Sequence, residues 1–211
     1  MEYRIQGDFI QHLEVRLYPG EEFFAEKGAL IYLESGVEKE LVFNGPRLGR
    51  IISAKLSGES IFMLRLFNPT DRPRMIVVGS KCGLMPVRIT GETMICHRGV
   101  YVASCHRVDV STKLSFTGLA GGMGLLLQKI TGNTTVFLDT NGTPICRQLQ
   151  PGESIQVDEN HIIALHSITE RQMSSNWSLK NVMAGEGLSM LTITGPGQVY
   201  LSPGTFSIAE V

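Results

Sequence analysis

A Gly-Glu pair, followed by an apolar segment, a polar turn and a second apolar segment, occurs three times along this chain. The three copies begin at Gly20-Glu21, Gly91-Glu92 and Gly152-Glu153. Each copy is followed by a second glycine-led pair of apolar segments, which begins at Gly58, Gly121 or Gly185. Internal repetition of this kind is the signature of a tandem repeat architecture. It constrains the shape of the molecule strongly and its chemistry very little.

The repeat predicts one domain built from three units. We place the units at residues 1–84, 85–147 and 148–211, and no linker-like segment separates them. At 211 residues the chain fits one large domain or a few small units fused into one body. We predict an all-β fold of three tandem repeats with pseudo-threefold symmetry.

Period-two alternation of apolar and polar residues dominates the chain, as is typical of half-buried strands. Leu13, Val15 and Leu17 alternate with polar residues and are expected to face one way. We expect a strand pair to follow, with its strands at Phe23–Ala25 and Ala29–Leu33.

Two further local features are expected. The Asn141-Gly142 pair predicts a hairpin, because both residues readily take positive φ angles. One short helix is expected through residues 48–55.

The composition gives no sign of a nucleic-acid or membrane-spanning protein. Apolar residues make up 43% of the chain, charged residues 18%, and the formal net charge is −1. A basic stripe, as in dedicated nucleic-acid binders, is missing from the sequence. The uncharged, glycine-rich run at residues 114–128 is too short to span a bilayer. The four cysteines form no Cys-x-x-Cys pair, and no secretory signal leads the chain, so we expect a cytoplasmic protein.

Three motifs together resemble one known family. They are Tyr-Pro-Gly-Glu-x-x-x-Ala-Glu-x-Gly-Ala from Tyr18, Leu-Ser-Gly-Glu-Ser-Ile-Phe from Leu56, and Thr-Gly-Pro-Gly-Gln-Val-Tyr-Leu from Thr194. The chain resembles a bacterial member of the "altered inheritance of mitochondria" (mitochondrial biogenesis) family over nearly its whole length. The resemblance implies three β repeats, each like a subunit of the tryptophan RNA-binding attenuation protein. It also implies a role without an established enzymatic activity.

The repeated glycines and glutamates have a structural and a catalytic interpretation. A carboxylate beside a turn glycine accepts hydrogen bonds from backbone N–H groups, which fixes the loop. A catalytic site needs one constellation of residues, whereas this motif is repeated, so we favour the structural role. The residues assigned to it are Gly20, Glu21, Gly58, Glu59, Gly91, Glu92, Gly152, Glu153, Gly185 and Glu186.

Glu26, His97 and Asp158 occupy equivalent positions, six residues after the glycines of the three copies. If the units surround a common axis, two carboxylates and an imidazole would converge, which suits Zn, Mn or Fe. The alternative is that each side chain is solvated at a strand end before a polar turn. We favour that alternative and predict no cofactor.

Cys96-His97 and Cys105-His106 raise a second zinc hypothesis, because cysteine and histidine are zinc ligands. Adjacent residues of a strand point to opposite faces, so at most one residue of each pair reaches a shared site. A small buried cysteine that packs as an apolar residue is the commoner outcome.

The sequence therefore predicts a non-catalytic β-repeat scaffold or binding module, not an enzyme. We expect self-association or binding to a protein partner, because repeated units leave strand edges to be paired. Two alternatives stay open: RNA binding by analogy of fold, and a metal-dependent enzyme that uses Glu26, His97 and Asp158. Binding to nucleic acid is disfavoured, and peripheral association with a membrane stays compatible with the sequence.

Overall fold

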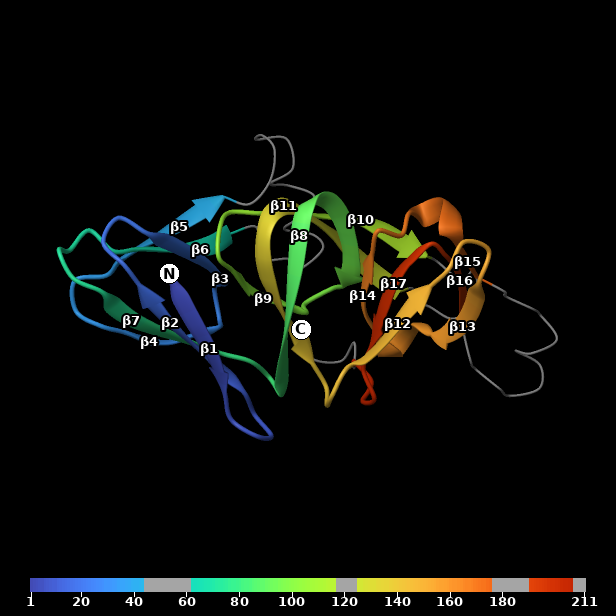
Figure 1. Ribbon diagram of the computed structural model, residues 1–211, viewed down its shortest axis with the longest axis horizontal. Coiled ribbons are helices and arrows are strands. Elements are labelled where there is room, and N and C mark those ends of the chain that lie inside the picture. Colours follow the sequence, from blue (N-terminus) through green and yellow to red (C-terminus); the bar gives the residue numbers. More distant parts are fainter. Residues whose placement is uncertain (44–61, 117–124, 176–189, 207–211) are drawn as a thin grey trace.

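The computed structural model describes residues 1–43, 62–116, 125–175 and 190–206 of the chain (Figure 1). These residues form antiparallel strands, joined by turns and by two short 3-10 helices, η2 (Glu159–His161) and η3 (Glu170–Gln172). The predicted all-β class is confirmed. The short helix expected through residues 48–55 lies outside the described residues.

The described part of the first unit, residues 1–43 and 62–84, contains seven strands. They are β1 (Glu2–Gln6), β2 (His12–Leu17), β3 (Glu22–Glu26), β4 (Leu30–Leu33), β5 (Glu38–Phe43), β6 (Phe62–Phe67) and β7 (Arg74–Gly79). One sheet has the order β1-β2-β7-β4, and β3, β6 and β5 pair side by side in another. The unit is thus a small sandwich of two sheets.

The second and third units contain the remaining strands of the described chain. The second contains β8 (Gly83–His97), β9 (Tyr101–Ser104), β10 (Asp109–Phe116) and β11 (Leu125–Thr140). The third contains β12 (Ile145–Leu149), β13 (Ser154–Asp158), β14 (Ile162–His166), β15 (Met173–Ser175), β16 (Met190–Thr194) and β17 (Gly197–Leu201). The strands of these units begin at Gly83 and Ile145. The boundaries expected at residues 85 and 148 stay a prediction.

The same strand pairings recur in all three units. In the first unit β2 and β4 flank β7, while β3 and β5 flank β6. In the third unit β12 and β14 flank β17, while β13 and β15 flank β16. In the second unit β8 and β11 are each long enough to supply two of these strands, and β9 and β10 pair with the two halves of β11. A bulge falls at Ile31, Val102 and Ile163, the same position of each unit.

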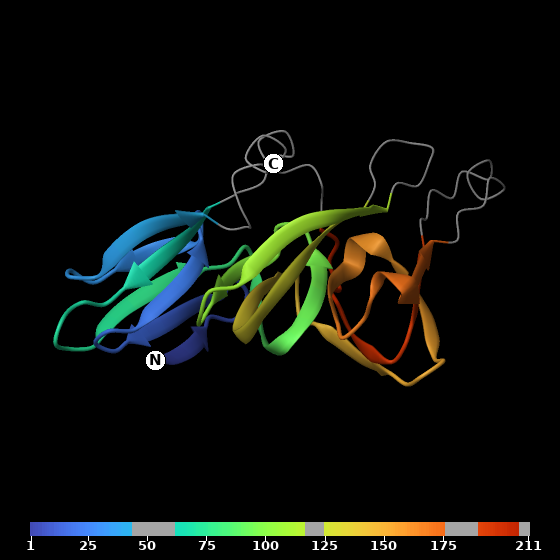
Figure 2. The ribbon, with the colours of Figure 1, turned by 90° about the horizontal axis from the view of Figure 1, so that it is seen from above.

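The three units lie side by side in a row, with the first and third at opposite ends of an elongated molecule (Figures 1 and 2). Two joints connect them: β3 of the first unit pairs with β9 of the second, and β8 of the second pairs with β14 of the third. These joints merge half of each outer unit with the second unit into one ten-stranded sheet. Over the described part of the chain the units therefore do not surround the common axis on which a convergence of Glu26, His97 and Asp158 would depend. The pseudo-threefold symmetry stays a prediction. The likeness of each unit to a subunit of the tryptophan RNA-binding attenuation protein stays a prediction.

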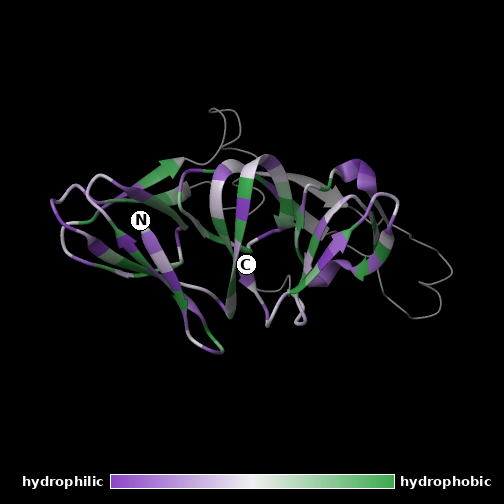
Figure 3. Cartoon of the chain, viewed as in Figure 1, coloured by the Kyte–Doolittle hydropathy of each residue, from purple (hydrophilic) through white to green (hydrophobic). Residues whose placement is uncertain are grey.

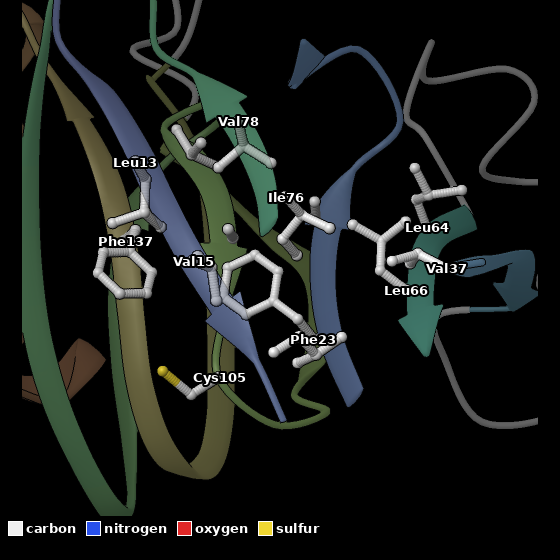
Figure 4. Close-up of a cluster of buried hydrophobic side chains, with 14 of the residues drawn as sticks. Leu13, Val15, Phe23, Val37, Leu64, Leu66, Ile76, Val78, Cys105 and Phe137 are labelled. Carbon is white, nitrogen blue, oxygen red and sulfur yellow. The ribbon is translucent and has the colours of Figure 1, made fainter. Parts of the chain in front are cut away.

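The core lies between the two sheets of each unit. Leu13, Val15 and Leu17 all point into it with no exposed surface, so their predicted common face is confirmed. Phe23 and Phe137 pack beside them, with ring centroids 6.3 Å apart (Figure 4). Hydrophobic and hydrophilic residues are interleaved along the strands (Figure 3), as expected when one face of a strand is buried.

Two local predictions were wrong. The strands β3 and β4 are consecutive but do not pair with each other, because the turn closed by Ala29 N–H and Glu26 C=O leads the chain from one sheet to the other. The Asn141-Gly142 turn exists, with φ of +98° at Gly142, but it leads from β11 into the third unit. Its two flanking strands pair elsewhere, since β12 pairs with β17.

Candidate functional site

The Gly-Glu corners of the first and third units have the same geometry. In the first, Gly20 has φ of +77°, Glu21 N–H donates to Tyr18 C=O at 3.1 Å, and Tyr18 N–H donates to Glu21 Oε2 at 2.9 Å. The third unit repeats this at Gln150, Gly152 and Glu153, where φ is +82° and the two bonds are 3.0 and 2.9 Å long. The positive φ favours glycine. One carboxylate oxygen bonds within its own turn and closes the corner between two sheets. The other oxygen accepts from the Met1 amino group in the first unit and from Arg147 in the third.

The corner of the second unit is built differently. Gly91, with φ of +102°, lies within the continuous strand β8, beside a register shift in the ladder to β11. Glu92 Oε2 accepts hydrogen bonds from the N–H and the hydroxyl of Thr90 at 3.0 and 2.8 Å. Its other oxygen, Oε1, lies 2.6 Å from His166 Nε2 on β14.

The Glu92–His166 contact ties the second unit to the third, because β14 belongs to the third unit. The bond to His166 is the main cause that lowers the pKa of Glu92 from 4.5 to about 2. Sequence reasoning missed His166, since no local pattern marks it. The predicted corners at Gly58, Glu59, Gly185 and Glu186 lie outside the described residues.

Glu26 and Asp158 are each held within their own unit. Glu26 Oε2 accepts from Gly28 N–H at 3.2 Å, and Asp158 Oδ1 accepts from Asn160 N–H at 2.9 Å. Both carboxylates therefore stabilise the turn that follows their strand. Over residues 1–43, 62–116, 125–175 and 190–206 no group of three or more His, Cys, Asp and Glu is arranged to hold a metal ion. The structure does not bring the predicted triad together.

His97 is buried at the end of β8. Its Nδ1–H donates to Arg98 C=O at 2.8 Å, and its ring stacks on Phe206 with centroids 5.1 Å apart. Burial lowers the pKa of His97, which favours the neutral form of the imidazole. These contacts give it a packing role.

The cysteines next to the histidines behave as small apolar residues. Cys96 and Cys105 are buried, and burial raises the pKa of their thiols to about 12 and about 11. A thiol with such a pKa is a weak nucleophile and a poor metal ligand at neutral pH. His106, beside Cys105, is exposed.

The two joints between units are antiparallel ladders of the same kind. At the first, Phe24 pairs with Ser104 and Ala25 with Ala103. At the second, Met94 pairs with His166, Ile95 with Leu165 and Cys96 with Ala164. The strands that meet at the joints are largely buried.

At each end of the row lies a strand that corresponds to the strands of the internal joints, and this strand is exposed. The first unit ends its sheet with β4, and the third ends its sheet with β13. Ile31 and Tyr32 on β4 are 60% and 50% exposed. The described part of the chain therefore carries an apolar strand edge at one end and a second open edge at the other.

The sequence matches the family described as "Mitochondrial biogenesis AIM24" over residues 3–204. The chain belongs to this family. The resemblance stated from the sequence motifs is thereby confirmed. The structure is also similar to the X-ray crystal structure of protein SPYM3_0169 from Streptococcus pyogenes, with a TM-score of 0.71 and 17% sequence identity. That match covers 97% of this chain and 94% of the other, and it supports the fold alone.

Family membership leaves the chemistry of this AIM24 protein open. Among curated proteins, none matches the chain. In the described residues, helices of the length and apolarity needed to cross a membrane are absent. The cytoplasmic location expected from the sequence stays a prediction.

Asp139 is a buried carboxyl group that sequence reasoning also missed. Burial raises its pKa to about 6, although its Oδ1 accepts a hydrogen bond from Lys81 N–H at 3.0 Å. It lies near the end of β11, where it connects this strand to the segment that enters the second unit. We see a structural role here, because its hydrogen bond fixes a backbone group of the connecting segment.

An open hollow on this AIM24 protein, about 340 Å³ in volume, is lined by Arg65, Phe67 and neighbouring residues of β5. Arg65 Nε donates to Glu22 Oε2 at 2.7 Å, and Arg65 Nη1 donates to Glu40 Oε2 at 3.3 Å. The guanidinium also lies 5.0 Å from the centre of the Phe67 ring. Two carboxylates already balance its charge, so the hollow does not favour an anionic ligand.

Proposed function

We propose that this protein is a non-catalytic β-repeat scaffold that acts by binding protein chains along its strand edges, including copies of itself. The observation that carries the proposal is the exposed apolar edge of β4, where Ile31 and Tyr32 are 60% and 50% exposed. An open, apolar strand edge is a template for pairing with another chain. Addition of a strand to such an edge is a recurring mode of protein recognition.

The reactive groups near the repeated motifs support a structural role. The carboxylates of Glu21, Glu92 and Glu153 hold their own turns together. The thiols of Cys96 and Cys105 are buried. Each of these groups is thus committed to the fold.

RNA binding, the alternative by analogy of fold, gains no support from the charges. The chain carries a formal net charge of −1, and affinity for nucleic acid depends mainly on cationic contacts with phosphates. Arg65, which is partly exposed, is balanced by Glu22 and Glu40.

Light scattering on the purified protein at micromolar concentration tests the proposal. We expect a mass above that of one chain, and we expect Ile31→Lys to lower it, because a lysine on an edge strand opposes pairing. Leu41→Lys is the matched control, since Leu41 is an apolar residue with 51% exposure on β5, an edge strand whose Lys39 and Glu40 already oppose pairing. The proposal is wrong if the native protein has the mass of one chain and no protein co-purifies with it from its own cells.

A further inference from the structure

We propose that copies of this protein assemble head to tail, with β13 of one copy pairing antiparallel with β4 of the next. The inference rests on the proposed function and names its partner: a second copy of the same chain. It also specifies the two strands and their register.

The two joints inside the chain provide the template. At each joint, a strand equivalent to β13 in one unit pairs with a strand equivalent to β4 in the following unit. The first joint pairs β3 with β9, and the second pairs β8 with β14. In the described part of the chain β13 and β4 are the last strands of their sheets, so neither has the neighbour that its equivalents have at the two joints. A second copy supplies the missing neighbour at both ends.

The assembly would repeat the sheet structure of the chain. Each internal joint merges the sheet of one unit with the sheet of the next, and together the two joints produce the ten-stranded sheet. The three-stranded sheet β13-β16-β15 and the four-stranded sheet β1-β2-β7-β4 are the halves left unmerged at the two ends. Pairing β13 with β4 merges them in the same manner.

The register follows from the shared bulge and the shared corner. The bulge makes Leu33 equivalent to Ser104 and Leu165, which lie opposite Phe24 and Ile95 at the two internal joints. The residue of the third unit that corresponds to Phe24 and Ile95, counted from the corner glycines, is Gln156. Gln156 of one copy is therefore placed opposite Leu33 of the next, and Val157 opposite Tyr32.

Exposure distinguishes the end strands from their internal equivalents. Val102 and Ala103 on β9, and Ile163 and Ala164 on β14, are fully or almost fully buried. The equivalent residues of β4, Ile31 and Tyr32, are at least half exposed. Gln156 on β13 is exposed too, whereas its equivalents Phe24 and Ile95 are buried. Pairing between copies buries the large apolar side chains of β4, and an aromatic residue beside a β-branched one, Tyr32 beside Val157, is a favourable cross-strand pair.

Charge separates these two edges from three other outer strands. The outer strands β1, β5 and β12 carry Arg4, Lys39 and Arg147, and charged residues protect edge strands from pairing. The outer strand β15 is uncharged too, but it is only three residues long. β4 consists of Leu30, Ile31, Tyr32 and Leu33 and has neither a charge nor a proline. β13 carries its single charge at its last residue, Asp158.

The joint between copies is weaker than the internal joints. In the first unit Glu34 occupies the position equivalent to His166, so the joint between copies has no counterpart of the Glu92–His166 ion pair. Glu34 of one copy instead approaches Glu153 of another, whose charge is partly balanced by Arg147 at 3.2 Å. We therefore expect reversible association that depends on protein concentration. Because the contact is heterologous, it forms a ring if the rotation closes and an open filament otherwise.

Disulfide trapping between two variants of the full chain, each with one introduced cysteine, tests the register. Both carry Cys82→Ser and Cys146→Ser, which remove the less buried native thiols. One also carries Gln156→Cys and the other Leu33→Cys. We expect the mixture to give a disulfide-linked pair on a non-reducing gel, while each variant alone stays at the mass of one chain. A mixture of Gln156→Cys with Tyr32→Cys is the control, because Tyr32 points to the opposite face from Leu33.

The outcomes separate this inference from the proposed function. Cross-linking of either variant with itself would show a symmetric contact and would overturn the head-to-tail arrangement. A native protein that is multimeric by light scattering, combined with no cross-link in the Gln156→Cys and Leu33→Cys mixture, would overturn the inference and leave the proposed function standing. A native protein with the mass of one chain, and no co-purifying protein, would overturn both.

Discussion

Replacing Glu92 by glutamine removes the ion pair that spans the joint between the second and third units. The glutamine keeps an acceptor oxygen for Thr90 N–H, so the corner of β8 is preserved. The lost interaction is a charge-assisted contact of 2.6 Å between partly buried side chains. We expect the free energy of unfolding to fall by about 1.5 kcal/mol at pH 6, since solvent screens a pair that is not fully buried. For a chain of this size that corresponds to a fall in Tm of about 3–6 °C.

The pH dependence makes this prediction specific. The folded-state pKa of Glu92, about 2, lies below its ordinary value of 4.5. The stabilisation is therefore complete above about pH 4.5 and is lost as the pH falls toward about 2. Urea unfolding of the native protein and of Glu92→Gln at pH 6 and pH 3 measures this stabilisation. We expect the difference between their free energies of unfolding to shrink at pH 3.

Glu153→Gln is the matched control for Glu92→Gln. Glu153 holds the equivalent corner, but its ion-pair partner Arg147 is exposed. We expect it to cost less than about 0.5 kcal/mol. Equal losses for the two variants, or a loss for Glu92→Gln that is the same at both pH values, would refute the role assigned to His166.

Two other substitutions and one labelling experiment test the fold. Phe137→Ala deletes a fully buried ring, and we expect a loss of about 3–5 kcal/mol in urea unfolding, whereas a loss below about 1 kcal/mol would contradict its place in the core. Gly197→Ala places a Cβ against the Ile168 side chain at a φ of +153°, so we expect a loss of at least about 2 kcal/mol by thermal unfolding, and a neutral result would refute that close approach. Cys146 is exposed and should react with a thiol reagent in the native protein, whereas Cys96 should react at the rate of unfolding, and fast modification of both would show that Cys96 is accessible.

The sequence pattern predicted the local structure well because burial of one strand face leaves a direct trace. Leu13, Val15 and Leu17 alternate with polar residues, and all three are buried on one face of β2. The apolar Phe23–Ala25 segment likewise forms β3. These elements follow from period-two alternation, which depends on short stretches of chain.

The strand partners were harder to predict, because they depend on contacts distant in sequence. β3 and β4 read as a hairpin around Gly28, but each pairs with a strand more than thirty residues further on. The corner at Gly91 reads like the corner at Gly20, yet β8 continues through it. A repeat pattern indicates three units but does not say whether they form a ring or a row. The convergence of Glu26, His97 and Asp158 was considered because a ring was one of these two arrangements.

The sequence predicted that open strand edges would exist, but it did not predict which strands would form them. Open strand edges were expected from the repeats, and β4 and β13 are such edges. Identifying them required knowing which strands the joints use. His166 and Asp139 carry no motif, and their environments come from strands that meet only in the folded chain.

The unbroken strands β8 and β11, of 15 and 16 residues, run through both layers of the middle unit. Covalent backbone therefore links those layers, and they cannot slide past one another as separate sheets can. Bending of the elongated body must then concentrate where the outer units attach. The two attachments resist such bending in different ways: that of the first unit buries Phe137 of β11 in its core beside two β3–β9 residue pairs, whereas that of the third adds the Glu92–His166 contact to three residue pairs.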